Sequence, residues 1–247
     1  MRPPDATRPR TFFPTAINTY RQCPERYYHR YIRKRKGVLP FNRPMILGGA
    51  THRMIAASLP RYLQTGEIAA DLAEQAMAEI ATSDYPEEER PYREQDARDV
   101  VDLTLTALRM VPRESHSLLQ ERNLYRPLGR SGIEIGARID LVMQDAEGRI
   151  EHIDFKTGKV RDNTVQSLMA RVVVGHRYRA APEIQTTTLY LAQRQRHSVT
   201  LERAASRHDW QSIARNIQDI RSRDDFPPTP GPLCEFCPFQ TRYCSAW

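Results

Sequence analysis

The cysteines are the feature that most restricts how this chain can fold. One of them, Cys23, lies near the start, and the others are Cys234, Cys237 and Cys244 in the segment CEFCPFQTRYC near the end. Four thiolates suit a tetrahedral zinc site or an iron–sulfur cluster, and their spacing alone does not separate the two. If all four bind one metal centre, the first helix and the C-terminal tail must meet, although most of the chain lies between them.

The composition is that of a soluble protein with a moderate positive excess. The chain has 247 residues, 40% of them hydrophobic, and no apolar run near the roughly 18 residues that a membrane span needs. The first residues lack the apolar region of a secretory signal, which predicts a cytoplasmic protein without disulfides. Lys and Arg outnumber Asp and Glu by 37 to 30, which is compatible with a nucleic-acid partner.

The pattern of apolar residues changes along the chain. Residues 1–13 are rich in Pro and Arg and are predicted to be loose, and residues 14–117 are predicted to be mainly helical, beginning with a helix capped by Thr15. Residues 118–225 contain strands joined by turns, followed by helices and further strands, and residues 226–247 form a cysteine-rich tail. Helices first and then a sheet with helices predict a single mixed α/β domain over 1–247.

Two of the predicted strands, GIEIGARIDLVM and RIEHIDFKT, are separated by DAEG. A three-residue loop with Gly148 in the left-handed conformation would place Asp140 directly opposite Asp154. Residues two apart in a strand share a face, so Lys156 would lie beside Asp154 while Phe155 points the other way. We therefore predict a cluster of two carboxylates and one lysine on one face of a hairpin.

This cluster suits the metal-dependent cleavage of phosphodiesters. Two carboxylates about 4–5 Å apart repel each other unless a cation lies between them. Mg²⁺ binds carboxylates and leaves positions for water or phosphate, so it would hold the scissile phosphate and lower the pKa of an attacking water. Lys156 would orient that water or offset the charge that builds at phosphorus. The alternative is a hairpin whose charged residues simply face water.

Several segments resemble one known family. GARID followed by IDFKTG is similar to the core motif of the PD-(D/E)XK nuclease superfamily, in its RecB-like branch. PTAINTYRQCPERYYHRYI and LGGATHRMI resemble the Cys-Pro segment and the Gly-x-x-x-His helix of that branch. The resemblance extends from about residue 12 to 244. It implies a restriction-endonuclease-like core, with a mixed central sheet flanked by helices, and N- and C-terminal segments joined by a four-cysteine metal cluster.

The resemblance also implies roles for single residues. Asp140 and Asp154 match the metal-binding acids of the family, and His52 matches a histidine that faces the metal. The carbonyl of Phe155 falls where the family has a backbone ligand. Lys156 matches the catalytic lysine.

Two further residues match the family in part. Glu121 lies where many members have an upstream acid, and a plain glutamate at a strand edge is the alternative. Gln166 is the best match to a glutamine on the helix after the lysine, but position 170 is Ala where the family usually has Tyr. Gln185 and Tyr190 offer the same pair with one residue too many between them, in a segment that is predicted to be extended.

For the cysteines, the resemblance favours iron and sulfur. The division into one plus three is similar to that of the [4Fe-4S] nucleases of this branch, which include the CRISPR-associated RecB-like exonuclease and the AddB nuclease domain. Zinc ribbons usually have two local pairs of cysteines, unlike this chain, and Zn²⁺ is therefore the less favoured alternative. The last gap is six residues here and commonly five there. The cluster would have a structural role.

Together these features predict a metal-dependent DNA nuclease that uses Mg²⁺ or Mn²⁺. The resemblance implies an exonuclease that acts on single strands or DNA ends, in DNA repair or recombination, CRISPR adaptation or antiviral defence. The chain has no phosphate-binding G-x-x-x-x-G-K-[ST] loop, which excludes helicase activity, so a partner would supply any strand separation. A helicase or CRISPR integration proteins are the partners that the resemblance allows. The alternatives are a DNA-binding or scaffold subunit that does not cleave, and a zinc-stabilised scaffold with an incidental charged hairpin.

Overall fold

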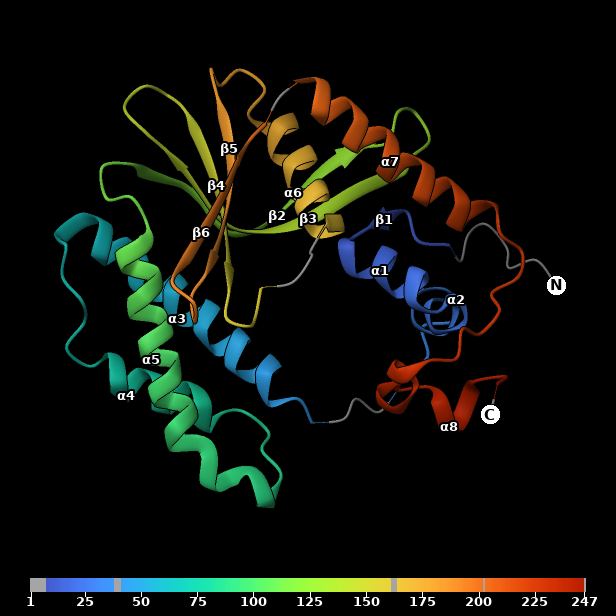
Figure 1. Cartoon of the computed structure of the whole chain (residues 1–247), viewed down its shortest axis with the longest axis horizontal. Helices are drawn as coiled ribbons and strands as arrows, with labels where there is room; N and C mark the ends of the chain where they lie inside the picture. Colours follow the sequence, from blue (N-terminus) through green and yellow to red (C-terminus); the bar gives the residue numbers. More distant parts are fainter. Residues whose placement is uncertain (1–7, 38–40, 161–163, 202, 247) are drawn as a thin grey trace.

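A mixed sheet flanked by helices forms the centre of the computed structural model, which describes residues 8–37, 41–160, 164–201 and 203–246 (Figure 1). Its strands are β1 (Thr11–Phe12), β2 (His116–Pro127), β3 (Glu134–Gln144), β4 (Ile150–Lys156), β5 (Ile184–Tyr190) and β6 (Gln195–Thr200). Strand β3 pairs with β2 along its whole length, and with the short β1 and with β4 at its opposite ends. The β1–β3 and β4–β5 pairs are parallel and the others are antiparallel. The predicted fold class is therefore confirmed.

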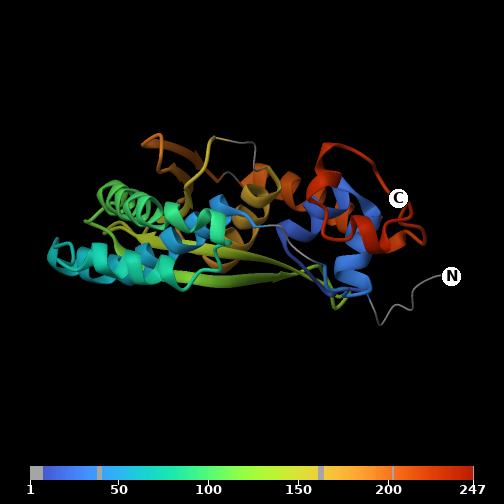
Figure 2. The same ribbon diagram turned by 90° about the horizontal axis from the view of Figure 1, so that it is seen from below.

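The helices gather in two groups at the ends of the molecule (Figures 1 and 2). One group is α3 (Arg43–Thr65), α4 (Leu72–Ala81) and α5 (Arg93–Met110), with the 3₁₀ turn η3 (Glu87–Tyr92). The other contains α1 (Pro14–Gln22), α2 (Pro24–Tyr27), the π-helix η2 (Tyr28–Ile32), η4 (Pro232–Phe236) and α8 (Gln240–Tyr243). Helices α6 (Thr164–Arg177) and α7 (Arg203–Ser222) pack against each other beside the sheet.

Two clusters of buried apolar side chains attach these helices to the sheet. The first joins α1, α6 and α7 to β3, with Ile17 and Ile217 almost fully buried in it. The second joins α3 and α5 to β3 and β4 through Leu59, Leu108 and Phe155. Phe155 lies between Asp154 and Lys156, so its burial fixes the strand that bears the predicted catalytic residues.

The N-terminal segment differs from the prediction. Residues 1–7 lie outside the described residues, but the next residues are not loose, because Thr11 and Phe12 form β1. The guanidinium of Arg8 is buried and donates to carbonyls at the end of α7, those of Ile220, Arg221 and Arg223. The contacts that order this segment come from residues far along the chain, which a local reading of composition does not reveal.

The first helix begins two residues earlier than predicted. Pro14 occupies the first helical position, which its fixed backbone angle favours, so Thr15 lies inside α1 and Phe13 takes the capping position. The helix ends before Cys23, and Pro24 starts the next one. This leaves Cys23 in an extended conformation between two helices.

An ion pair fixes the start of α3 against α5. Asp96 is fully buried, and it accepts hydrogen bonds from Arg43 Nε at 2.9 Å, from Arg43 Nη2 at 2.6 Å and from the Tyr85 hydroxyl at 2.6 Å. A buried carboxylate of this kind is tolerated because it is paired and hydrogen-bonded. The contact therefore sets the position of the helix that carries His52.

We expect Arg43→Met to lower the free energy of unfolding by about 3–5 kcal/mol, because Asp96 would keep a buried charge without its partner. Arg98→Met on α5 is the matched control, since Arg98 forms an exposed pair with Glu94 that is worth less than about 1 kcal/mol. Urea denaturation of both variants measures the difference. Equal losses in the two variants would show that the buried pair does not hold α3.

Among the described residues, no helix combines the length and the apolar character needed to cross a lipid bilayer.

Candidate active site

The β3–β4 hairpin has the predicted register. Leu141 pairs with Ile153, and Gly148 in the loop has a φ of +78°. The same register places Asp140 opposite Asp154, just beyond the last backbone pair. There the Oδ2 atom of Asp140 accepts the backbone N–H of Phe155 at 2.9 Å. At the point where the β3–β4 pairing ends, the Asp140 carboxylate thus takes the place of a backbone carbonyl as the acceptor of this N–H.

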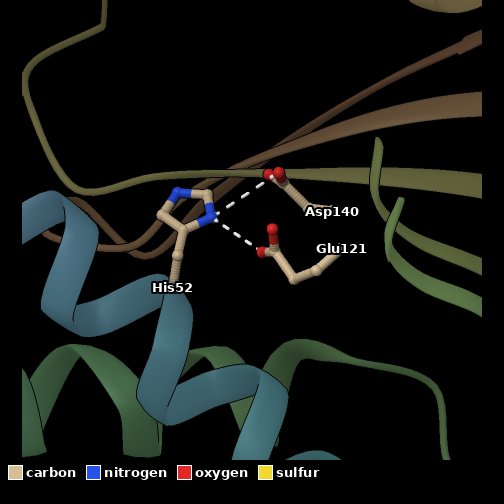
Figure 3. A group of neighbouring side chains, drawn as sticks. All are labelled: His52, Glu121 and Asp140. Atoms are coloured by element: carbon tan, nitrogen blue, oxygen red, sulfur yellow. Dashed lines mark hydrogen bonds and ion pairs between the residues drawn. The ribbon is translucent and has the colours of Figure 1, made fainter. Parts of the chain in front are cut away.

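Three potential metal ligands converge beside this point. His52 reaches it from α3, Glu121 from β2 and Asp140 from β3 (Figure 3). The Nδ1 atom of His52 lies 3.3 Å from Glu121 Oε1 and 3.5 Å from Asp140 Oδ1. One potential ligand atom from each residue lies within 4.8 Å of the other two.

Glu121 occupies a strained position in the middle of β2. Its neighbours Gln120 and Arg122 pair with β3, but Glu121 itself has a φ of +46°, a conformation that costs a residue other than glycine roughly 1–3 kcal/mol. Arg138 on β3 holds its carboxylate, with Nε and Nη2 at 2.9 and 2.8 Å from Oε2. Strain of this kind clusters at functional sites. The structure therefore places Glu121 in the group and not at a plain strand edge.

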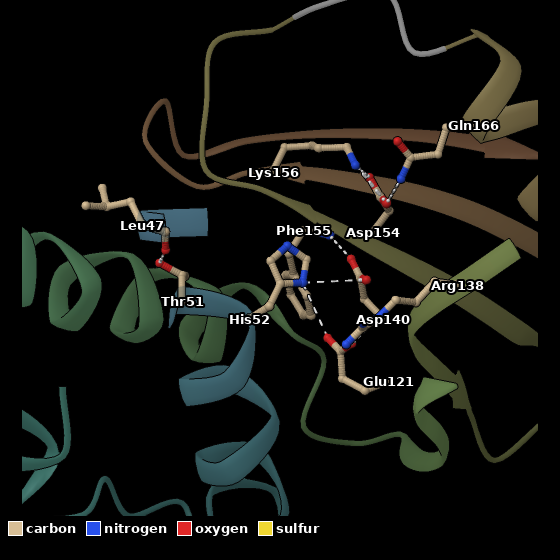
Figure 4. Close-up of polar contacts among 10 residues, drawn as sticks. All are labelled: Leu47, Thr51, His52, Glu121, Arg138, Asp140, Asp154, Phe155, Lys156 and Gln166. Atoms are coloured by element: carbon tan, nitrogen blue, oxygen red, sulfur yellow. Dashed lines mark hydrogen bonds and ion pairs between the residues drawn. The ribbon is translucent and has the colours of Figure 1, made fainter. Parts of the chain in front are cut away.

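A second polar group lies next to the first. Lys156 Nζ is 2.8 Å from Asp154 Oδ2, and Gln166 Nε2 on α6 donates to Asp154 Oδ1 at 2.9 Å (Figure 4). The Asp154 carboxylate is therefore held from two sides. The ring of Phe155 is buried and meets the His52 ring edge to face, with 6.2 Å between the centroids. That the Phe155 carbonyl is a ligand stays a prediction.

The electrostatics of the group favour a cation. Burial, and then the nearby charge of Asp154, raises the pKa of Asp140 to about 7. Burial alone would lower the pKa of His52, but the hydrogen bond to Glu121 and the charges of Asp140 and Glu121 outweigh it and raise that pKa. The acids thus favour the protonated form of His52, and a divalent ion bound among the three residues would offset their negative charge more fully.

The spacing of the donor atoms also fits such an ion. Ligands at about 2.1 Å from an octahedral Mg²⁺ lie roughly 3.0–4.2 Å from one another. The distances from His52 Nδ1 to Glu121 and Asp140, 3.3 and 3.5 Å, fall in this range. Two carboxylates suit Mg²⁺ and Mn²⁺, and an added imidazole suits a first-row transition metal such as Mn²⁺.

Sequence reasoning missed Arg138. Its signal was its place two residues before Asp140 in GARID, because residues two apart in a strand share a face. Its contact with Glu121, however, depends on how β2 pairs with β3, which the sequence does not reveal.

The four cysteines also meet. Cys23, Cys234, Cys237 and Cys244 line one cavity between α2 and the C-terminal tail, which lie side by side in both views (Figures 1 and 2). Cys23 Sγ accepts backbone N–H groups from Arg26 and Thr229 at 3.4 Å, one from each end of the chain. Cys234 Sγ accepts the N–H of Gly231 at 3.3 Å, and the Cys244 thiol donates to Glu25 at 3.1 Å.

One known family matches nearly the whole chain. The model of the PD-(D/E)XK nuclease superfamily matches residues 11–244. No curated protein matches the chain. Among solved structures, the protein SSO0001 is 13% identical, with 96% of this chain and 86% of that chain covered and a TM-score of 0.43. A protein from Eubacterium rectale, provisionally named as an exonuclease, is 11% identical, with 92% and 87% covered and a TM-score of 0.47. The family match spans both polar groups and all four cysteines, and this chain belongs to the PD-(D/E)XK nuclease superfamily.

Proposed function

We propose that the chain is a metal-dependent deoxyribonuclease, and that it is an exonuclease acting on single strands or DNA ends. The observation that carries the proposal is the meeting of His52, Glu121 and Asp140 beside a lysine that Asp154 holds. Membership of the superfamily supports phosphodiester cleavage. The exonuclease preference rests on the resemblance of the Cys-Pro and Gly-x-x-x-His segments to the RecB-like branch.

His52, Glu121 and Asp140 would hold Mg²⁺ or Mn²⁺, and Asp154 and the Phe155 carbonyl would be its further ligands. When bound, such an ion would polarise the scissile phosphate and lower the pKa of a water molecule. The chain already orients two of these donors. Arg138 holds Glu121, and the N–H of Phe155 holds Asp140. Contacts of this kind around a metal ligand fix its direction and are commonly worth 10- to 100-fold in affinity or activity.

Lys156 would act on the phosphate itself. Its ammonium group extends from the end of β4, and the Asp154 carboxylate sets its direction. It would orient the attacking water or donate to a phosphate oxygen as negative charge builds at phosphorus. Gln166 would contribute indirectly, because its side-chain amide donates a hydrogen bond to the other oxygen of Asp154.

We expect Lys156→Ala to slow the cleavage of end-labelled DNA by at least about 100-fold while the protein still binds Mn²⁺. Lys159→Ala is the matched control, because Lys159 is an exposed lysine three residues further on. Single- and double-stranded substrates are incubated with Mg²⁺ or Mn²⁺. Cleavage by Lys156→Ala at the wild-type rate would show that the lysine has no part in the mechanism.

In the same assay, the wild type should degrade linear single strands and leave circular ones intact. Cleavage of a circular strand would contradict exonuclease action.

We also propose that the four cysteines hold a [4Fe-4S] cluster with a structural role. All four line one cavity in the described part of the chain. Their division into one plus three, which resembles that of the [4Fe-4S] nucleases of the RecB-like branch, supports iron and sulfur over zinc. The backbone N–H groups that point at Cys23 and Cys234 would stabilise their thiolates.

A further inference from the structure

Two adjoining hollows begin beside the residues that follow the proposed catalytic lysine in the chain. The first, of about 310 Å³, is bordered by Thr157 and Gly158, which directly follow Lys156, and by Arg43 and Pro44 at the start of α3. The second, of about 740 Å³, shares Arg43 and Pro44 with the first and extends to the cysteine-rich tail. Its size lies within the roughly 300–1,000 Å³ of ligand-binding sites. Because they share these two residues, we treat the two hollows together as the strand groove, which extends from the residues after β4 to the tail.

The far end of the strand groove is unusually apolar for a surface. Met45, Leu233 and Phe236 line it, and they are 62%, 52% and 56% exposed. Large apolar side chains that gather at an exposed hollow mark a binding site more often than isolated ones do. The half-exposed ring of Phe236 offers a flat surface on which a nucleic-acid base can stack.

The same hollow carries uncompensated positive charge. Arg26 and Arg30 line it, and neither forms an ion pair with a carboxylate of the described residues. Arg26 Nε is buried and has no hydrogen-bond partner within the described chain. Arg43 is already paired with Asp96, and Glu89 is the acidic residue among those lining this second hollow, whereas Asp96 and Asp99 line the first. Two unpaired guanidinium groups therefore face one carboxylate, a balance that favours an anionic ligand.

We propose that the strand groove binds a single strand of DNA, with its backbone along Arg26 and Arg30 and a base stacked on Phe236. This rests on the proposed function, because the strand would be the substrate whose scissile phosphate lies near Lys156. A single strand fits better than a duplex, since stacking on a protein ring needs bases whose faces are free. Arginines supply the sequence-independent attraction to phosphates.

The proposal gives the cysteine cluster a second consequence. Phe236 lies between Cys234 and Cys237, and Leu233 directly precedes Cys234. The metal centre that joins the two ends of the chain would therefore also fix the side chains that stack on the strand.

The test is equilibrium binding of a fluorescent single-stranded oligonucleotide in the presence of EDTA, which prevents cleavage. We expect Phe236→Ala to weaken binding by about 5- to 150-fold, and Phe236→Tyr to restore it to within about twofold. Arg30→Ala should weaken binding and reduce the salt dependence by about one phosphate contact. Arg130→Ala, in the turn between β2 and β3 and outside the groove, is the matched control.

Wild-type binding by both Phe236→Ala and Arg30→Ala would overturn the strand groove. Arg30→Ala also serves if the change at Phe236 disturbs the neighbouring cysteines. Cleavage of the same oligonucleotide with Mn²⁺ separates this failure from that of the proposed function. A wild type that cuts DNA, with variants that bind normally, would contradict the groove alone. A wild type that neither binds nor cuts would contradict both.

Discussion

Asp140→Asn will remove metal-dependent cleavage while preserving the fold. The carboxylate of Asp140 is almost fully buried and faces His52. Contacts around a metal ligand are worth about 10- to 100-fold, so the loss of a ligand itself should slow cleavage by at least about 100-fold. Asparagine keeps an oxygen that accepts the N–H of Phe155, so the open end of the hairpin should keep its geometry. Asp102→Asn, at an exposed position on α5, is the matched control.

The same substitution should not destabilise the metal-free protein at high pH. Burial and the charge of Asp154 raise the pKa of Asp140 from 3.8 to about 7, so the folded state binds this proton more tightly than the unfolded state does. The stability that this group contributes therefore falls as the pH rises from about 4 to 7. Asn carries no such charge. In EDTA, Asp140→Asn should be at least as stable as the wild type at pH 8, and its advantage should shrink toward pH 4.

Thermal unfolding at pH 4 and pH 8 measures the pH dependence of stability, and unfolding with and without Mn²⁺ measures metal binding. Mn²⁺ should raise the melting temperature of the wild type, because a ligand of the folded state stabilises it, and should leave that of Asp140→Asn unchanged. Rapid cleavage by Asp140→Asn, or a normal stabilisation by Mn²⁺, would contradict the assignment of Asp140 as a ligand.

Cys23→Ser should loosen both ends of the chain at once. Cys23 lies between α1 and α2, and its sulfur accepts N–H groups from Arg26 and from Thr229 of the tail. Much of the binding free energy of a structural metal site is folding free energy. Even a third of the about 10–16 kcal/mol known for structural zinc would lower the melting temperature by roughly 10–20 °C.

The decisive comparison is with Cys237→Ser, at the other end of the chain. If one centre holds all four sulfurs, both variants should lose iron, the brown colour and the protection of the tail against proteases, and to similar extents. Iron and sulfide analysis, visible absorption and limited proteolysis measure this. Stoichiometric zinc in the wild type would show that the cysteines hold Zn²⁺ and not an iron–sulfur cluster. Different behaviour of the two variants would contradict a shared centre.

The parts of the site that the sequence predicts are those set by local geometry. The register that brings Asp140 opposite Asp154 follows from a short loop with Gly148 at its left-handed position. The neighbouring positions of Asp154 and Lys156 follow from the alternation of a strand. His52 was found through the resemblance to a family, because its helix meets the sheet only in the tertiary structure.

The parts that the sequence does not predict depend on pairing between distant segments. Glu121 turns toward His52 because of its left-handed backbone and because Arg138 holds it, and the contact with Arg138 depends on how β2 pairs with β3. In the sequence, Gln166 only partly matches a glutamine motif of the family, because position 170 is Ala. The packing of α6 places its amide on Asp154, which no spacing along the chain indicates.

The proposed metal ligands come from two different layers of the fold. His52 belongs to α3, whose start is fixed to α5 by Arg43 and Asp96, whereas Glu121 and Asp140 belong to the sheet. An ion bound by all three would be a crosslink between the helical layer and the sheet. Any movement of α3 away from the sheet would then take the imidazole from the acids and disassemble the centre. The protein would thus be active only while α3 is packed against the sheet.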